Sequence, residues 1–145
     1  MSAPIRTATI DDLDAVMAIE RASFPTDAWS EPAMRDTFET GDAFVAEDHR
    51  GIVGYAAVLA PRGSGDADVL TIAVGDGFRG EGTGAALLQR MVDTAAERGA
   101  ARVFLEVRAD NPVAQRLYVS RGFRPVGRRR HYLSLIHISE PTRPY

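Results

Sequence analysis

Residues 70–92 are LTIAVGDGFRGEGTGAALLQRMV, the most informative segment of the chain. An apolar run at 67–74 has the composition of a buried strand, and a glycine-rich stretch at 75–84 interrupts it. Apolar side chains then recur at helical spacing and form one stripe, made of Leu87, Leu88, Met91, Val92 and Ala95. Gly99 stands where a left-handed helix cap is expected. The segment therefore predicts a strand, a glycine-rich loop and an amphipathic helix.

The glycine-rich loop is suited to bind a phosphate. Glycine lets backbone N–H groups approach an anion closely at the N-terminus of a helix, where the helix dipole favours negative charge. The loop is not a Walker loop because no Gly-Lys-Ser/Thr follows, and the spacing Gly80-x-Gly82-x-Gly84 is weak evidence for a dinucleotide-binding fold. Taken alone, the loop is equally consistent with a flexible surface turn.

The residues before this segment predict two helices and a β-hairpin. Apolar residues at helical spacing continue to Phe24, and Ser30 with Pro32 has the pattern that begins a second helix. Two apolar runs follow, at 43–48 and 52–60, and a turn signal separates them. We expect these two runs to pair as antiparallel strands.

The residues after the segment, FLEVRADNPVAQRLYVSRGF at 104–123, contain two candidate catalytic side chains. Glu106 lies within an apolar strand, where the pKa of a carboxyl group should rise unless the group is paired. Tyr118 lies in a helix that begins at Asn111 and Pro112, and its ring should be covered while its hydroxyl stays available. A carboxylate with a raised pKa suits a general base, and a phenol suits a proton donor. The structural alternatives are a strand residue paired with arginine, a core aromatic, and for Asn111 a simple helix cap.

Length and composition limit the class of protein. The chain has 145 residues, a net charge of −3 at pH 7 and 45% hydrophobic residues, which indicates one globular domain. The predicted elements give it a mixed α/β class with a central sheet and no internal repeat. The absence of cysteine excludes disulfides, thiolate zinc sites and a cysteine nucleophile. Three scattered histidines make poor metal ligands, so we expect no metal.

The same features bear on location and partners. The longest nearly unbroken apolar run, at 52–60, is far shorter than the roughly 20 residues that span a bilayer. The first residues have no signal-peptide pattern, so we expect a cytoplasmic protein without membrane contact. The negative net charge argues against direct nucleic-acid binding, although all 17 basic residues are arginine.

Together, the loop and the downstream motif resemble the GNAT family of acetyl-CoA-dependent N-acetyltransferases, over about residues 4 to 132. Arg79 to Gly84 match the family signature Arg/Gln-x-x-Gly-x-Gly/Ala. The motifs IERASFP, DAWS, LTIAV, LEVRADN, LY and GF are similar to the RimI-type branch, which acetylates the N-terminal alanine of a small-subunit ribosomal protein. The resemblance implies the GNAT fold, a central mixed, splayed β-sheet of about six or seven strands flanked by about four helices.

The resemblance also implies roles for individual residues. Glu106 matches the residue that takes the proton of the incoming amine, and Tyr118 matches the acid that protonates the thiolate of coenzyme A. Acetyl-CoA, the co-substrate, would insert between strands 69–74 and 103–107, and no metal is required. The implied cofactor-binding positions are Ile72, Ala73, Val74, Arg79, Gly80, Glu81, Gly82, Thr83, Gly84, Ala85 and Asn111.

Recognition of the acceptor is the least specified feature of the sequence. The candidates are Glu20, Trp29 in the loop FPTDAWS, and the run RRRHY at 128–132. Trp29 could equally be a hydrophobic plug between helices, and the arginines could be a solvated strand edge. A small-molecule amine or a lysine as acceptor, and a non-catalytic acetyl-CoA-binding module, are the alternative functions. We expect a monomer or a weak dimer.

The end of the chain departs from the RimI-type pattern, which usually has two tyrosines at 131–132 and then a last apolar strand. We therefore divide the chain into a GNAT domain at 1–132 and an atypical tail at 133–145. The tail, LSLIHISEPTRPY, resembles the translated adapter-like endings of truncated reading frames, which would leave the native final strand missing. In the alternative, the alternation in SLIHI forms that strand and pairs with residues 123–130.

Overall fold

The seven strands of the described chain form one mixed sheet. The computed structural model describes residues 2–138. Its elements are, in chain order, β1 (Ile5–Thr7), a 3-10 helix (Ile10–Asp12), α1 (Leu13–Ser23), α2 (Glu31–Thr40), β2 (Asp42–Asp48), β3 (Gly51–Leu59), β4 (Asp66–Val74), α3 (Thr83–Glu97), β5 (Arg102–Arg108), α4 (Pro112–Ser120), β6 (Arg124–Arg129) and β7 (Tyr132–Ile138). The strand order is β1-β2-β3-β4-β5-β7-β6. The predicted α/β class, with six or seven strands and four α-helices, is confirmed.

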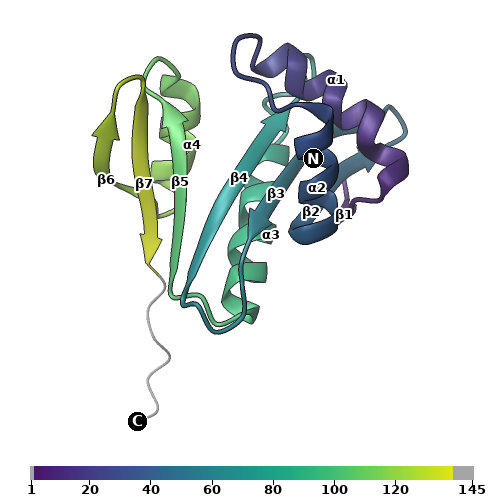
Figure 1. Cartoon of the computed structure of the whole chain (residues 1–145). Coiled ribbons are helices and arrows are strands. Elements are labelled where there is room, and N and C mark those ends of the chain that lie inside the picture. The colour runs from purple at the N-terminus through teal and green to yellow at the C-terminus, as the bar shows by residue number, and fades with distance from the viewer. Residues whose placement is uncertain (1, 139–145) are drawn as a thin grey trace.

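β4 and β5 lie side by side at one end only (Figure 1). They run parallel and pair from Asp66 with Arg102 to Asp68 with Phe104. Beyond that point β4 continues against β3 as far as Val74, while β5 turns away and pairs along its length with β7. The expected splay of the sheet is thus confirmed, and within residues 2–138 the backbone edge of residues 72–74 has no pairing strand on the β5 side.

Helices cover both faces of the sheet, and a hydrophobic core lies between the helices and the strands on each face. α1 and α2 pack Leu13, Met17 and Met34 against Val45 and Tyr55 on one face. The core on the other face, under α3 and α4, includes Leu87, Leu88, Met91, Tyr118, Phe123 and Leu135. Figure 1 shows α1 and α2 in front of the strands and α3 behind them. None of the helices in residues 2–138 is long and apolar enough to cross a membrane.

The helix starts agree with the sequence patterns. The Ser30 side chain accepts a hydrogen bond of 3.2 Å from the Ala33 N–H at the start of α2. The Asn111 side chain accepts one of 3.1 Å from the Ala114 N–H at the start of α4. Each cap satisfies a backbone donor that has no partner within its helix. α4 thereby begins beside the end of β5, close to the cleft described below.

Residues 132–138 form a full strand of the sheet. β7 lies between β5 and β6 and pairs with β5 from Arg102 with Ile138 to Arg108 with Tyr132. Its pairing with β6 corresponds to the alternative in which SLIHI forms the last strand. The division of the chain at residue 132 stays a prediction, although β7 crosses it. The remainder of the expected tail, 139–145, lies outside the described residues.

Candidate active site

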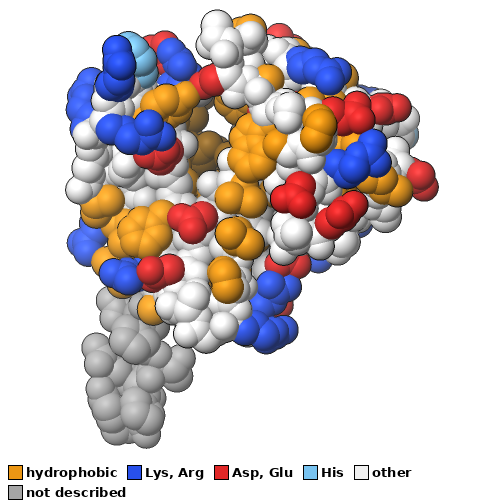
Figure 2. All heavy atoms as spheres, in the orientation of Figure 1, with side chains coloured by type: hydrophobic (Ala, Val, Ile, Leu, Met, Phe, Trp, Pro, Cys, Tyr) orange, Lys and Arg blue, Asp and Glu red, His pale blue; other side chains and the backbone are white. Residues whose placement is uncertain are grey.

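A large cleft opens where β4 and β5 diverge. Its volume is about 1540 Å³, and its walls come from β4, β5, α4, the glycine-rich loop and the loop between α1 and α2. Figure 2 shows the molecule hollowed between its two halves, with hydrophobic side chains on the visible walls. The cleft therefore brings together the two motifs that the sequence separates by two dozen residues.

The glycine-rich loop forms one end of the cleft. Gly80 and Gly82 both have a φ of 83°, and a Cβ at either position would meet no atom within 4 Å. Gly82 is the N-cap of α3, and the next residue, Thr83, has a buried hydroxyl with no hydrogen-bond partner in the described chain. A positive helix terminus, an orphaned hydroxyl and open space beside glycines fit a diphosphate group such as that of coenzyme A.

The sequence-predicted cofactor positions gather around this cleft with one exception. Most of them line it: Ile72, Ala73, Val74, Arg79, Gly80, Gly82, Thr83, Gly84, Ala85 and Asn111. Glu81 does not line it, and its side chain instead forms an ion pair with Arg50. Arg79 donates a hydrogen bond of 3.2 Å to the Val74 carbonyl oxygen, so that this arginine ties the loop to the end of β4.

Glu106 faces the cleft from β5 and is paired. Its carboxylate accepts hydrogen bonds from Arg129 Nη2 at 2.5 Å and Nε at 2.7 Å, and its side chain is 41% exposed. The Arg129 guanidinium holds the pKa of the carboxyl group below its ordinary value, since it stabilises the charged form. The sequence predicted a raised pKa unless the group was paired, and the structure shows the paired alternative, a strand carboxylate bound to an arginine, with a lowered pKa.

Tyr118 lies on α4 at the wall of the same cleft. The residue is 7% exposed and packs edge-on against Phe123, with ring centroids 6.3 Å apart. Burial raises the pKa of its hydroxyl to about 12. The hydroxyl makes no hydrogen bond to another part of residues 2–138. A covered ring with an uncommitted hydroxyl is the arrangement expected from the sequence.

Glu20 is a buried support beside the cleft. Its carboxylate accepts hydrogen bonds from the Trp29 N–H at 2.9 Å, from the Thr71 hydroxyl at 3.1 Å and from the Tyr55 hydroxyl. The residue is 1% exposed and also lines the cleft, so a role for Glu20 in acceptor recognition stays a prediction. Trp29 lines the cleft and also packs against the core under α1 and α2, which agrees with both interpretations of this residue.

The loop between α1 and α2 reaches across the cleft to β5 and β7. Asp27 accepts a hydrogen bond from the Tyr132 hydroxyl, and its carboxylate lies 3.5 Å from Arg108 Nη1. The sequence did not predict a role for Asp27 or its ion pair with Arg108. It also did not predict that the partner of Glu106 is Arg129. The only signal for Asp27 was its position in the DAWS motif, because its partners are 81 and 105 residues away.

Residues 128–132 divide between two roles. All three arginines at 128–130 are exposed, but Arg129 forms an ion pair with Glu106, and the Tyr132 hydroxyl donates a hydrogen bond to Asp27. As for metal ions, residues 2–138 hold no group of three or more His, Cys, Asp or Glu side chains arranged to bind one.

The chain is similar to known acetyltransferases in sequence and in structure. The model of the acetyltransferase (GNAT) family matches residues 13–123. A Bacillus subtilis protein with the provisional name ribosomal protein bS18-alanine N-acetyltransferase is 32% identical over 133 residues, which are 90% of this chain and 86% of that protein. The crystal structure of the Escherichia coli ribosomal-protein-S18-alanine N-acetyltransferase matches with a TM-score of 0.83 and 27% identity, over 98% of this chain and 97% of that one. Ard1 from Thermoplasma volcanium has the same fold, with a TM-score of 0.84 and 24% identity over 97% of this chain and 99% of that one.

Proposed function

The chain belongs to the GNAT family of acetyl-CoA-dependent N-acetyltransferases, and from that premise we propose that its acceptor is the α-amine of a protein N-terminus. The acceptor we favour is the N-terminal alanine of a small-subunit ribosomal protein, because two of its relatives are named for that reaction. The observation that carries the proposal is the single cleft that has the glycine-rich loop at one end and both Glu106 and Tyr118 on its walls.

The proposed binding mode follows from the shape of the cleft. The diphosphate of coenzyme A would lie at Gly80, Gly82 and Thr83, where the N-terminus of α3 favours negative charge. The pantetheine arm would run along the unpaired backbone of residues 72–74 and form strand-like hydrogen bonds with it. Backbone N–H groups of the same residues would stabilise the negative charge that develops on the thioester oxygen. Acetyl-CoA itself supplies the activated acetyl group.

Glu106 is the proposed proton acceptor. As the acceptor nitrogen attacks, a bond forms between this nitrogen and the acetyl carbon, and the nitrogen loses a proton to Glu106, directly or through water. Arg129 lowers the pKa of the carboxyl group, so that the ionised Glu106 carboxylate is a weaker base than an unpaired glutamate. An α-amine suits so weak a base, because its own pKa is about 7.7–8.0 whereas that of lysine is about 10.4.

Tyr118 is the proposed proton donor. When the bond between the acetyl carbon and sulfur breaks, the thiolate of coenzyme A takes the phenolic proton, and solvent later restores it. A pKa of about 12 keeps this hydroxyl protonated at neutral pH, ready to donate. Positioning of the amine against the thioester would supply much of the remaining rate enhancement.

Mass spectrometry of acetylated peptides tests the proposal. Purified protein is incubated with acetyl-CoA and peptides that begin with alanine, glycine, serine or methionine, and with one N-terminally blocked peptide that offers an internal lysine. We expect acetylation of the α-amine, fastest on the alanine peptide. Acetylation of lysine alone would point to the alternative acceptor, and normal binding of acetyl-CoA without acetylation of any amine would favour a non-catalytic module.

A further inference from the structure

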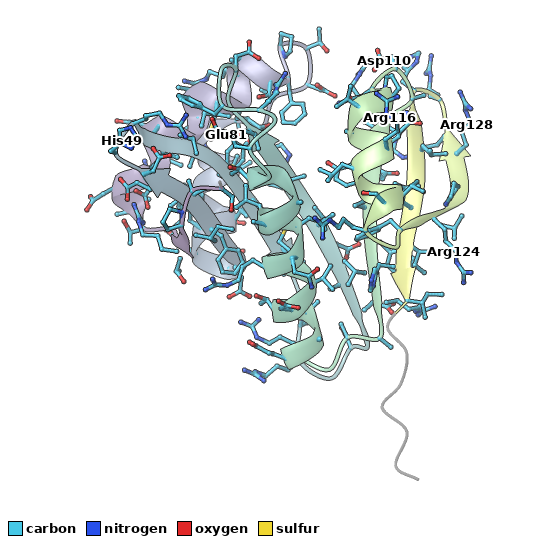
Figure 3. All side chains as sticks on the ribbon, turned by 180° about the vertical axis from the view of Figure 1, so that it is seen from behind. His49, Glu81, Asp110, Arg116, Arg124 and Arg128 are labelled. Carbon is cyan, nitrogen blue, oxygen red and sulfur yellow. The ribbon has the colours of Figure 1, made fainter. Side chains whose placement is uncertain are left out.

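Glu81 is the one acidic residue in the loop at 79–85, and its side chain is turned away from the cleft. Its two carboxylate oxygens accept hydrogen bonds from Arg50, one from Nη1 at 2.9 Å and one from Nη2 at 2.7 Å. Arg50 lies 31 residues earlier in the chain, at the turn between β2 and β3. Figure 3 labels Glu81 and His49, the neighbour of Arg50, on the same upper side of the molecule.

Arg50 is itself held in place from three directions. The Asp48 carboxylate accepts hydrogen bonds from the Arg50 backbone N–H at 2.8 Å and from Nη2 at 2.6 Å. The guanidinium also stacks over the ring of Phe78, with its central carbon 4.9 Å from the ring centroid. Phe78 belongs to the loop before α3 and lines the cleft. Arg50 therefore contacts the glycine-rich loop at two side chains, one charged and one aromatic.

The charge at this position matters because of what the cleft is proposed to bind. An unpaired carboxylate beside a diphosphate would repel it, whereas a carboxylate paired with arginine presents little net charge. The bidentate geometry also fixes the direction of the Glu81 side chain, away from the cleft. Glu81 and Arg50 thus act as a unit that keeps the negative charge of Glu81 out of the binding site.

We infer that Arg50 is a positioning residue for acetyl-CoA: its pairing with Glu81 holds that carboxylate away from the diphosphate site. The inference rests on the proposed use of the cleft for acetyl-CoA and goes beyond it, because Arg50 lies in a different part of the chain from every other cofactor-binding position. The contacts of Arg50 are with Glu81, Asp48 and Phe78, so its effect reaches acetyl-CoA through the loop.

The test is a double-mutant cycle on coenzyme A binding. Binding of coenzyme A to the wild-type chain, Arg50→Gln, Glu81→Gln and the double variant is measured by calorimetry, with thermal unfolding as a check that each variant folds. We expect Arg50→Gln to weaken binding about 5- to 10-fold at low salt, and less at high salt, because the interaction is electrostatic. We expect Glu81→Gln and the double variant to stay within about 2-fold of the wild type, since neither leaves a free carboxylate in the loop.

Two further readouts separate positioning from a general loosening of the protein. Turnover of S-acetylpantetheine, which has no diphosphate, should be equal in the wild type and Arg50→Gln, and kcat at saturating acetyl-CoA should change less than KM. Arg35→Gln is the matched control, because it breaks an exposed ion pair of 3.1 Å with Glu31 on α2. The inference would be overturned if Arg50→Gln and the double variant lost binding equally. It would also be overturned if Arg50→Gln lost no binding. A wild-type chain that binds no coenzyme A would contradict the proposed function itself.

Discussion

A neighbouring arginine, Arg129, weakens the candidate base, Glu106, by stabilising its charged form. Arg129 lowers the pKa of the carboxyl group, so the carboxylate is ionised over the whole neutral range. A weak base of this kind is adequate only for an acceptor that is already partly deprotonated. This is the reason for which we propose an α-amine, and not the more basic amine of lysine, as the acceptor.

Replacement of Glu106 tests its role directly. We expect Glu106→Gln to lower kcat by about 100-fold, which is within the usual contribution of a general base, and to leave acetyl-CoA binding within about 2-fold. Glu39→Gln is the control, because it makes the same replacement of a carboxylate by an amide at an exposed position on α2. Steady-state kinetics with the alanine peptide supply the measurement. A kcat within a few-fold of the wild-type value would remove Glu106 from the mechanism.

The pH dependence tests Glu106 and Tyr118 together. The pKa of Glu106 is lowered and that of Tyr118 is raised to about 12, so neither group changes its charge between pH 6 and pH 10. We expect kcat/KM to rise with pH as the acceptor amine loses its proton near pH 8 and then to reach a plateau. Tyr118→Phe should lower the plateau and leave the shape unchanged. A fall in kcat/KM between pH 9 and pH 10 would contradict the assignment of Tyr118.

The sequence brought forward Glu106, Tyr118 and the glycine-rich loop as candidates, but it did not predict the arginines that the structure pairs with Glu106 and Glu81. Glu106 and Tyr118 lie within local motifs whose spacing can be read along the chain. Arg129 is 23 residues from Glu106, and Arg50 is 31 residues from Glu81. Such pairs depend on which strands become neighbours, and periodicity and composition do not carry that information.

At the scale of elements, short sequence patterns predicted the starts of helices and the pairing of neighbouring strands most reliably. The caps at Ser30 and Asn111 and the hairpin of β2 and β3 follow from patterns within a few residues, and the structure confirms all three. The splay between β4 and β5 was expected only from the family resemblance. In the structure β5 pairs with β4 only over the three residues from Arg102 to Phe104, whereas its other edge pairs with β7 along the whole strand.

A substitution at Gly82 tests the loop as an element. Gly82 has a φ of 83° at the N-cap of α3, a conformation in which alanine costs roughly 1 kcal/mol. We expect Gly82→Ala to raise KM for acetyl-CoA several-fold, because the helix terminus moves relative to the cleft. Gly63→Ala is matched to it, with a φ of 81° in the turn between β3 and β4. It should lower the free energy of unfolding by a similar amount but leave KM unchanged, and an equal rise in KM in both variants would contradict the proposal.

At the scale of the whole molecule, β7 contributes both to the sheet and to a contact across the cleft. It supplies the partner strand of β5 and carries Tyr132, which binds Asp27 across the cleft. The sequence left two alternatives for this segment because it departs from the family pattern. The structure has a strand here, with buried Leu135 and Ile136 facing opposite sides of the sheet as alternation requires.

The position of β7 can be tested by stability. Leu135 is 0% exposed, and removal of a fully buried leucine side chain typically costs about 2–5 kcal/mol. We expect Leu135→Ala to lower the free energy of unfolding by that amount in urea denaturation. Leu59→Ala, at a residue 37% exposed at the end of β3, should cost less than about 1 kcal/mol. Equal, small effects of the two variants would contradict an interior position for this strand.

A pair of peptides that differ in which amine is free distinguishes an α-amine acceptor from a lysine acceptor. Two versions of one alanine-starting peptide are offered with acetyl-CoA, the first with a free α-amine and dimethylated lysines, the second with a blocked α-amine and free lysines, and the initial rate of coenzyme A release is recorded for each. We predict turnover of the first peptide, loss of that turnover in Glu106→Gln, and no turnover of the second. Turnover of the second peptide alone would contradict the account, because it would show that the cleft serves lysine and not a protein N-terminus.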